Sequence, residues 1–278
     1  MLTSQLFELW GIDDEILLHS CQDHGSGSAV VLGGSLADNM GTPVSDIDVY
    51  CFSDATRPDG QHAFRRLNER VVHIHTVNRT TLGSLGGPLW QLLDEPQCLD
   101  GVPVLPPTTL SDLHALQAGR ALYDDGTLEQ LRVDSGSDLL GSYLVLRNLV
   151  RTRRLLQRLK DGPGAPAKVC VRGVLEATTD TCLAAIGLVN PNPKWRVELL
   201  SRAPSSRPDT RWTDAMVEAL RAGAPDDPAG QLALAGECLA DVFEEPTVRL
   251  LVAQRAGTQL LSLMDDVRKA LPLARNPL

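Results

Sequence analysis

The chain has 278 residues and a formal net charge of −9, with 35 acidic side chains against 26 Lys and Arg. An acidic chain with four Phe, three Tyr and four Trp offers little basic or stacking surface, which argues against a nucleic-acid polymer as its partner. It shows no apolar run long enough for a membrane span, no secretory leader and no paired cysteine spacing typical of zinc sites, so we expect a cytoplasmic protein that binds no membrane.

The N-terminal residues 2–20 have the apolar spacing of an amphipathic helix. Gly11 is expected to interrupt this helix, because glycine is a weak helix former. The candidates for its buried face are the large apolar residues Leu6, Leu9, Trp10, Ile16 and Leu17. We expect this face to pack on the layer that follows.

Residues 28–32 predict a short buried strand, because Ala, Val and Leu follow one another without a polar interruption. Gly33 and Gly34 then allow the backbone to turn tightly. A helix that starts near Ser35 would direct its free N–H groups at an anion. The segment therefore predicts a phosphate-binding turn.

Asp46 and Asp48 lie on the next predicted strand and share one of its faces, because strand side chains alternate. Two carboxylates on one face can hold one or two hard cations, and magnesium accepts such ligands together with phosphate oxygens and waters. Each half of the pattern has a simpler explanation, since Gly-Gly-Ser is a common turn and Asp-x-Asp a common solvated face. Their combination in this order and spacing favours a phosphate loop beside a metal site.

The combined pattern resembles the nucleotidyltransferase superfamily, which includes DNA polymerase beta and the kanamycin and lincosamide nucleotidyltransferases. The signature of that family is Gly-Ser, a short helix and Asp-x-Asp, matched here by Gly34, Ser35, Asp46 and Asp48. The resemblance is closest to the antibiotic and small-molecule enzymes. It implies a small mixed sheet that carries the acids, ATP or another nucleoside triphosphate as donor, Mg²⁺, and transfer to an acceptor hydroxyl. It covers residues 30–52 and indicates a reaction type rather than a substrate.

Residues 61–69 predict a crossover helix, and residues 70–77 predict a further strand. The family carries a third carboxylate on such a strand, and by its flanking residues His73 takes that place here, with His75 on the same face. A neutral imidazole can act as a base near pH 7, but it is a poor magnesium ligand. The alternatives are a site completed by His73 or His75, an impaired site, and two histidines on a solvated face.

The first domain is expected to close with a strand at 102–105, a helix at 111–119, and a strand end and turn at 121–126. A sheet of about four strands covered by helices results. The fold class is thus α+β, with a small mixed-sheet nucleotidyltransferase-like catalytic domain at 1–133. An all-α helix-bundle domain is expected at 134–278.

The first helix of that second domain carries a stripe of arginines on one face, at Arg147, Arg151, Arg154 and Arg158. Such a stripe is often a solvated face that balances an acidic surface. Guanidinium is also suited to bidentate phosphate contacts, so Arg147 and Arg151 are candidate ligands of a nucleoside triphosphate.

A proline-framed loop follows at 188–195, and it resembles a Pro-x-Lys-Trp loop of some antibiotic nucleotidyltransferase-like proteins. Lys194 could reach a phosphate there, or it could be solvated while Trp195 anchors the loop. Two connections and the last two helices are predicted at 162–166, 203–208, 231–244 and 247–271.

The predicted function is transfer of a nucleoside monophosphate, with AMP from ATP as the first candidate, to a hydroxyl of a small molecule such as an antibiotic or secondary metabolite. The alternative is a nucleotide-binding, regulatory or antitoxin-like protein that kept the fold and lacks the third carboxylate. In the predicted site, Mg²⁺ is held by Asp46 and Asp48, and catalysis involves these acids and His73. The candidate nucleotide contacts are Gly33, Gly34, Ser35, Arg147, Arg151 and Lys194.

Overall fold

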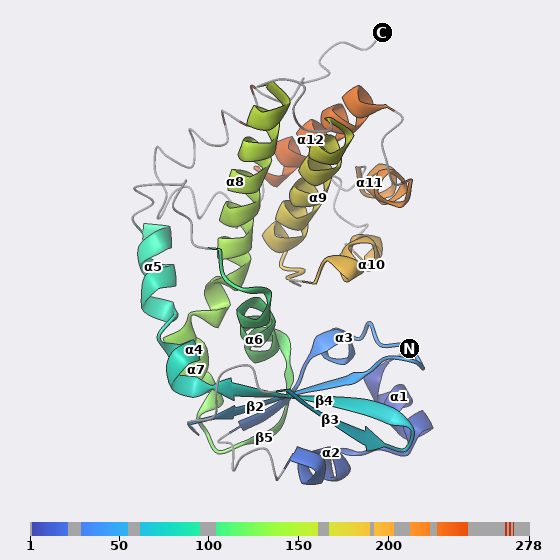
Figure 1. The fold of residues 1–278 in the computed structure, drawn as a ribbon, viewed down its shortest axis with the longest axis vertical. Coiled ribbons are helices and arrows are strands. Elements are labelled where there is room, and N and C mark those ends of the chain that lie inside the picture. The colour runs from blue at the N-terminus through green and yellow to red at the C-terminus, as the bar shows by residue number, and fades with distance from the viewer. Residues whose placement is uncertain are drawn as a thin grey trace. The chain divides into compact units, whose positions relative to one another are not determined.

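Figure 1 shows the computed structural model of the chain. The structure describes residues 2–21, 29–54, 62–94, 104–160, 167–189, 192–202, 212–222 and 227–243, with the single positions 265, 267 and 269. Residue contacts divide the chain into two units: Met1–Trp90 with Leu105–Leu140, and Gln91–Val104 with Gly141–Leu278. This division leaves residues 134–140 with the first unit.

A five-stranded sheet in the order β3-β4-β2-β1-β5 forms the centre of the first unit. Parallel pairing joins β2 to β4, whereas the other neighbours are antiparallel. The predicted α+β class with a mixed sheet is therefore confirmed. The strands are β1 (Ala29–Leu32), β2 (Ile47–Ser53), β3 (His62–Leu67), β4 (Arg70–Asn78) and β5 (Arg120–Asp124).

The crossover helix predicted over 61–69 is wrong, because β3 lies there and forms a hairpin with β4. The two turn residues, Asn68 and Glu69, both have positive φ angles of 44° and 70°. Two-residue turns of this kind match the twist of an antiparallel pair. Most side chains of β3 are exposed, so its polar sequence lacks the apolar alternation that marks a strand. The sheet therefore has five strands instead of about four.

The strand predicted at 102–105 lies partly outside the described residues, and Val104 and Leu105 are not in a strand. The helix predicted at 111–119 is present but begins earlier, at Pro107, because proline suits the first turn of a helix. The helices of this part are α1 (Thr3–Trp10), α2 (Asp14–Cys21), α3 (Gly34–Ala37), α4 (Arg79–Gly83), α5 (Gly86–Asp94), α6 (Pro107–Ala118) and α7 (Leu128–Ser135), followed by the 3-10 turn η3 (Ser137–Leu139).

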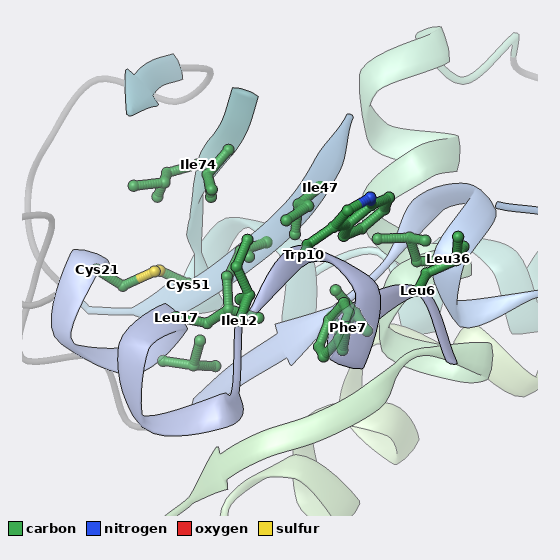
Figure 2. Packing of buried hydrophobic residues seen from close by; sticks show 14 residues of the cluster. Leu6, Phe7, Trp10, Ile12, Leu17, Cys21, Leu36, Ile47, Cys51 and Ile74 are labelled. Atoms are coloured by element: carbon green, nitrogen blue, oxygen red, sulfur yellow. The ribbon is translucent and has the colours of Figure 1, made fainter. Parts of the chain in front are cut away.

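The N-terminal helix is interrupted as predicted, because Gly11 adopts a left-handed conformation with φ of 61° and ends α1. Two of the predicted core candidates are exposed, Leu9 at 63% and Ile16 at 37%. The other three are buried, and they join Phe7, Ile12, Leu36, Ile47 and Ile74 in one apolar cluster (Figure 2).

The apolar cluster occupies one face of the sheet, where Ile47, Val49 and Cys51 of β2 are fully buried. Strand alternation directs the residues between them, Asp48 and Tyr50, to the opposite face. α2 and α6 lie on opposite sides of the sheet (Figure 1). The fold thus packs one sheet face on α1 and α2, whereas α6 lies on the face to which Asp48 and Tyr50 project.

All elements described after residue 140 are helical, in agreement with the predicted C-terminal helical region. They are α8 (Leu140–Lys160), α9 (Ala167–Ala185), the 3-10 turn η4 (Pro193–Trp195), α10 (Arg196–Arg202), α11 (Trp212–Arg221) and α12 (Pro228–Val242). Among the described helices, none has the length and apolarity that crossing a membrane requires. The predicted connections at 162–166 and 203–208 lie outside the described residues, as does most of the helix predicted at 247–271.

We predict that Leu17→Ala lowers the free energy of unfolding by about 2–5 kcal/mol, because it deletes a buried side chain and leaves a cavity. Leu17 is 0% exposed and lies within the apolar cluster, whereas Leu9 on α1 is 63% exposed. Leu9→Ala is therefore the matched control, with an expected change within about 0.5 kcal/mol. Urea unfolding followed by circular dichroism measures both, and equal effects would show that α2 does not anchor this core.

Candidate functional site

The turn after β1 lies directly against β2. The Gly33 N–H donates a hydrogen bond to the backbone carbonyl of Asp48 at 2.9 Å. Gly34 has a φ of +60°, and a Cβ added there would lie 2.2 Å from the Asp48 Oδ2 atom. Ser35 follows in α3 and is 8% exposed. Glycine at position 34 therefore serves two needs, because it adopts a left-handed backbone and leaves room for a carboxylate.

The two predicted acids come at the start of β2. Asp46 immediately precedes the strand and is exposed, while the Asp48 side chain is 28% exposed on the polar sheet face. The carboxylates of both residues lie near enough to His73 to act on its pKa, which each raises. The structure thus brings Gly34, Asp46, Asp48 and His73 together at one end of the central strands.

Two histidines of β4 accompany Asp48 because β2 and β4 are parallel neighbours. The register places His73 beside Asp48 and His75 beside Tyr50. The Asp48 Oδ1 atom lies 3.3 Å from His75 Nε2 and 3.6 Å from His73 Nδ1. The His73 Nε2 atom is buried and has no hydrogen-bond partner among the described residues.

A third histidine, His62 of β3, lies beside the two histidines of β4. No role for it was predicted from the sequence. The hairpin register places His62 opposite His75 and Phe64 opposite His73. The His62 ring lies 5.0 Å from the His73 ring and 4.9 Å from the His75 ring, between centroids. A helix over 61–69 would not place His62 beside β4. The sequence signal for its true position is the two-residue turn at Asn68 and Glu69, which joins β3 to β4 in a hairpin.

Burial and the neighbouring imidazoles lower the pKa of two of the histidines, His62 and His73. For His73, burial lowers the pKa most and His75 adds to the effect, while Asp48 opposes it. For His62, burial and then His75 lower the pKa. Both rings therefore favour the neutral form, in which one ring nitrogen keeps a free lone pair.

Tyr50 and Asp112 are further members of this site that the sequence did not indicate. The Tyr50 ring stacks on His75 at 4.3 Å between centroids, with an interplanar angle of 6°. Burial raises the pKa of Tyr50 well above its ordinary value, and the carboxylates of Asp48 and Asp112 raise it further. Asp112 comes from α6, whose sequence predicted only a helix.

A cleft of about 350 Å³ opens beside the histidines. His62 and His75 line it from the sheet, Asn78 and Thr81 from the end of β4 and α4, and Asp112 from α6. The ring of His75, whose Nε2 atom lies 3.3 Å from the Asp48 carboxylate, separates the cleft from this acid.

Two candidate residues of the second unit lie beside a group of ion pairs. Arg147 and Arg151 of α8 line a cavity of about 100 Å³ together with Asp180 and Arg196. Arg196 binds Asp180 through two hydrogen bonds of 2.6 and 2.8 Å, and Arg151 lies 3.8 Å from Glu176.

The remaining residues of the arginine stripe, Arg154 and Arg158, are exposed. In the loop before α10, the Lys194 ammonium lies 5.0 Å from the centre of the Trp195 ring. These cations belong to the second unit, and the structure brings Arg147 and Arg151, but not Arg154 and Arg158, to the cavity.

Comparison with known proteins identifies the segment that holds the acids, the glycine turn and the three histidines. Residues 14–84 match the nucleotidyltransferase domain family. This segment is a nucleotidyltransferase domain. The match runs from the start of α2 to the residue after α4, and therefore includes Gly34, Asp46, Asp48 and the histidines of β3 and β4.

Among solved structures, the chain is similar to a nucleotidyltransferase-like protein from Exiguobacterium sibiricum 255-15. The two sequences are 12% identical, the match covers 92% of this chain and 89% of that protein, and the TM-score is 0.41. No curated protein sequence matches this chain.

We predict that Gly34→Ala weakens the binding of Mn²⁺ to the nucleotidyltransferase domain by more than about tenfold, because the new Cβ displaces the Asp48 carboxylate. Electron paramagnetic resonance of free Mn²⁺ measures the affinity. Gly126→Ala is the matched control, since Gly126 also has a positive φ, of +96°, but has no atom within 4 Å of its Cβ position. An equal loss in both variants would assign the effect to backbone strain rather than to Asp48.

Proposed function

We propose that this chain transfers a nucleoside monophosphate, with AMP from ATP as the first candidate, to a hydroxyl group of a small molecule such as an antibiotic or secondary metabolite. The contact of Gly34 with Asp48 carries the proposal, because it joins the predicted phosphate turn to a carboxylate inside a nucleotidyltransferase domain. The proposed chemistry is attack of the acceptor oxygen on the α-phosphorus, with loss of pyrophosphate.

Asp46 and Asp48 are proposed to hold Mg²⁺. Carboxylate oxygens are hard ligands that suit magnesium, and Gly34 leaves open the space beside the Asp48 carboxylate that a side chain would fill. A bound Mg²⁺ would neutralise charge on the phosphates during transfer. Gly33, Gly34 and Ser35 are proposed to contact the β- and γ-phosphates, since the glycine backbone allows close approach.

His73 is the proposed proton acceptor for the attacking hydroxyl. Its ring lies beside Asp48 in the strand register, and its lowered pKa favours the neutral form that accepts a proton. The proton released as the oxygen–phosphorus bond forms would move to the imidazole. Asp48, 3.6 Å from Nδ1, would stabilise the resulting positive charge.

The cleft beside His62 and His75 is proposed to receive the acceptor. Its volume of about 350 Å³ is suited to a small molecule, and polar groups of Asn78, Thr81 and Asp112 border it. The carboxylate of Asp112 and the net charge of −9 favour an acceptor that carries amino groups as well as the reactive hydroxyl.

Arg147, Arg151 and Lys194 are proposed as additional contacts to the triphosphate. Arginine side chains bind phosphate in a bidentate manner, and Arg147 and Arg151 border one cavity of the second unit. Lys194 lies in the loop before α10 and would add a point charge.

A second candidate function is nucleotide binding without turnover, as in a regulatory or antitoxin-like protein. The observation that favours it is the presence of imidazoles at the strand position where the family carries its third carboxylate. This candidate keeps the nucleotide site and predicts binding without transfer.

We predict that Asp46→Asn and Asp48→Asn each weaken the binding of Mg²⁺-ATP by more than about tenfold, because a lost carboxylate leaves the cation's charge poorly compensated. Isothermal titration calorimetry on proteins that remain folded by circular dichroism measures the affinity. Asp125→Asn removes an exposed carboxylate from a turn and is the control. Parent-like Mg²⁺-ATP affinity in both Asp46→Asn and Asp48→Asn would show that these carboxylates do not hold the metal.

We predict that His73→Ala lowers the rate of nucleotidyl transfer by roughly a hundredfold or more while Mg²⁺-ATP binding persists, since general-base catalysis contributes about that much. His73→Asp should instead retain or raise the rate by supplying a carboxylate. Labelled ATP and a panel of hydroxylated metabolites provide the assay, with His75→Ala as the neighbouring variant. Equal rates in all four proteins would exclude both histidines, and binding without transfer in every protein would favour the second function.

A further inference from the structure

We propose that His62, His73 and His75 form a binding site for a transition-metal ion of the Zn²⁺ type on the polar face of the sheet. Each residue offers one ring nitrogen, and the three nitrogens lie within 4.8 Å of one another. Tetrahedral Zn²⁺ with Zn–N bonds of about 2.0–2.1 Å needs ligand nitrogens about 3.3 Å apart, which ring movements of about 1 Å supply.

The backbone register holds the three imidazoles together. His73 and His75 share one face of β4, and the hairpin places His62 directly opposite His75. All three therefore project from one antiparallel pair joined by a two-residue turn, rather than from separate loops. This arrangement reduces the conformational cost of assembling the ligands.

Two aromatic neighbours limit the orientations of the rings. Phe64 stacks on His73 at 4.5 Å between centroids, and Tyr50 stacks on His75 at 4.3 Å. Simple aromatic packing would explain these stacks, but it leaves the buried His73 Nε2 atom without a hydrogen-bond partner among the described residues. A metal ion supplies a partner for such a nitrogen, because the lone pair of a neutral imidazole is what the metal binds.

The donor set decides the class of metal. Imidazole suits Zn²⁺, Cu²⁺, Ni²⁺ and iron, whereas Mg²⁺ takes oxygen ligands. The Asp48 carboxylate lies 3.3 Å from His75 and 3.6 Å from His73, so it provides negative charge beside the imidazole rings. His62 is exposed and gives the ion a route from solvent. Three imidazoles with room for a fourth ligand are typical of open Zn²⁺ sites.

The inference is independent of nucleotidyl transfer, since imidazoles bind a metal whether or not a nucleotide is present. It concerns nitrogen ligands of β3 and β4, whereas the proposed Mg²⁺ site uses carboxylates at the start of β2. A metal ion on His73 excludes that residue as proton acceptor in the same molecule. Zn²⁺ should therefore suppress any transfer that uses His73 as a base.

The full chain, freed of metal by a chelator, is titrated with Zn²⁺ by calorimetry and with Co²⁺ by visible absorption. We expect binding of one ion by the parent, with the strong absorption of a four- or five-coordinate Co²⁺ site. His62→Gln and His75→Gln should each weaken binding by more than about tenfold. His19→Gln removes an exposed histidine outside the cluster and should bind as the parent does.

Parent-like Zn²⁺ affinity in His62→Gln, or an equal loss in His19→Gln, would overturn the proposal. X-ray absorption spectroscopy of the Zn²⁺-loaded parent needs no variant, and it should show scattering from imidazole rings, whereas an oxygen-only shell would also overturn it. Asp46→Asn separates the two metals, because it should weaken Mg²⁺-ATP and leave Zn²⁺ binding within about twofold of the parent. If the parent binds Zn²⁺ but not Mg²⁺-ATP, the proposed nucleotidyl transfer is contradicted and the Zn²⁺ site is not.

Discussion

The parallel pairing of β2 with β4 is the constraint on which the site of the first unit depends. It places His73 beside Asp48 and His75 beside Tyr50, in a register fixed by backbone hydrogen bonds. The same pairing sets Ile47 beside Val72 and Val49 beside Ile74, all four of which are fully buried. A slip of one residue would exchange the two faces and bury the histidines, so apolar packing on one face maintains the chemistry of the other.

The close approach of Gly34 to Asp48 connects this strand pair to the turn after β1. A side chain at position 34 would meet the carboxylate at 2.2 Å, and the φ of +60° already disfavours residues other than glycine. The carboxylate therefore borders a backbone surface that a phosphate can approach. A carboxylate beside an anion-binding turn repels the anion that the turn attracts unless a cation lies between them, and the proposed Mg²⁺ would be that cation.

Two kinds of proposed metal ligand meet on the polar sheet face. The acids at the start of β2 offer oxygen, and the hairpin of β3 and β4 offers nitrogen, with Asp48 in reach of both sets. Hard cations prefer the first kind and borderline transition metals the second. Asp112 of α6 adds a carboxylate to the neighbouring cleft. The proposed Mg²⁺ and Zn²⁺ sites therefore differ in their ligand atoms and share Asp48 as a neighbour.

The sequence by itself determined the elements whose signals are local. Strand alternation predicted that His73 and His75 share one face of a strand, and paired glycines predicted the turn after β1, because both signals depend on neighbouring residues alone. The break at Gly11 and the helical nature of the C-terminal part followed from the same kind of pattern.

Tertiary structure alone decided which distant residues meet. The polar edge strand β3 lacks apolar alternation, so hydrophobic periodicity does not reveal it, and the position of His62 is set by its pairing with β4 across the turn at Asn68 and Glu69. The packing of α6 against the sheet brings Asp112 to the cleft, and that of α2 brings the Cys21 and Cys51 sulfurs together although the sequence shows no paired spacing (Figure 2). Pairing register and helix docking are set by the sum of many long-range contacts, and no short stretch of sequence contains that sum.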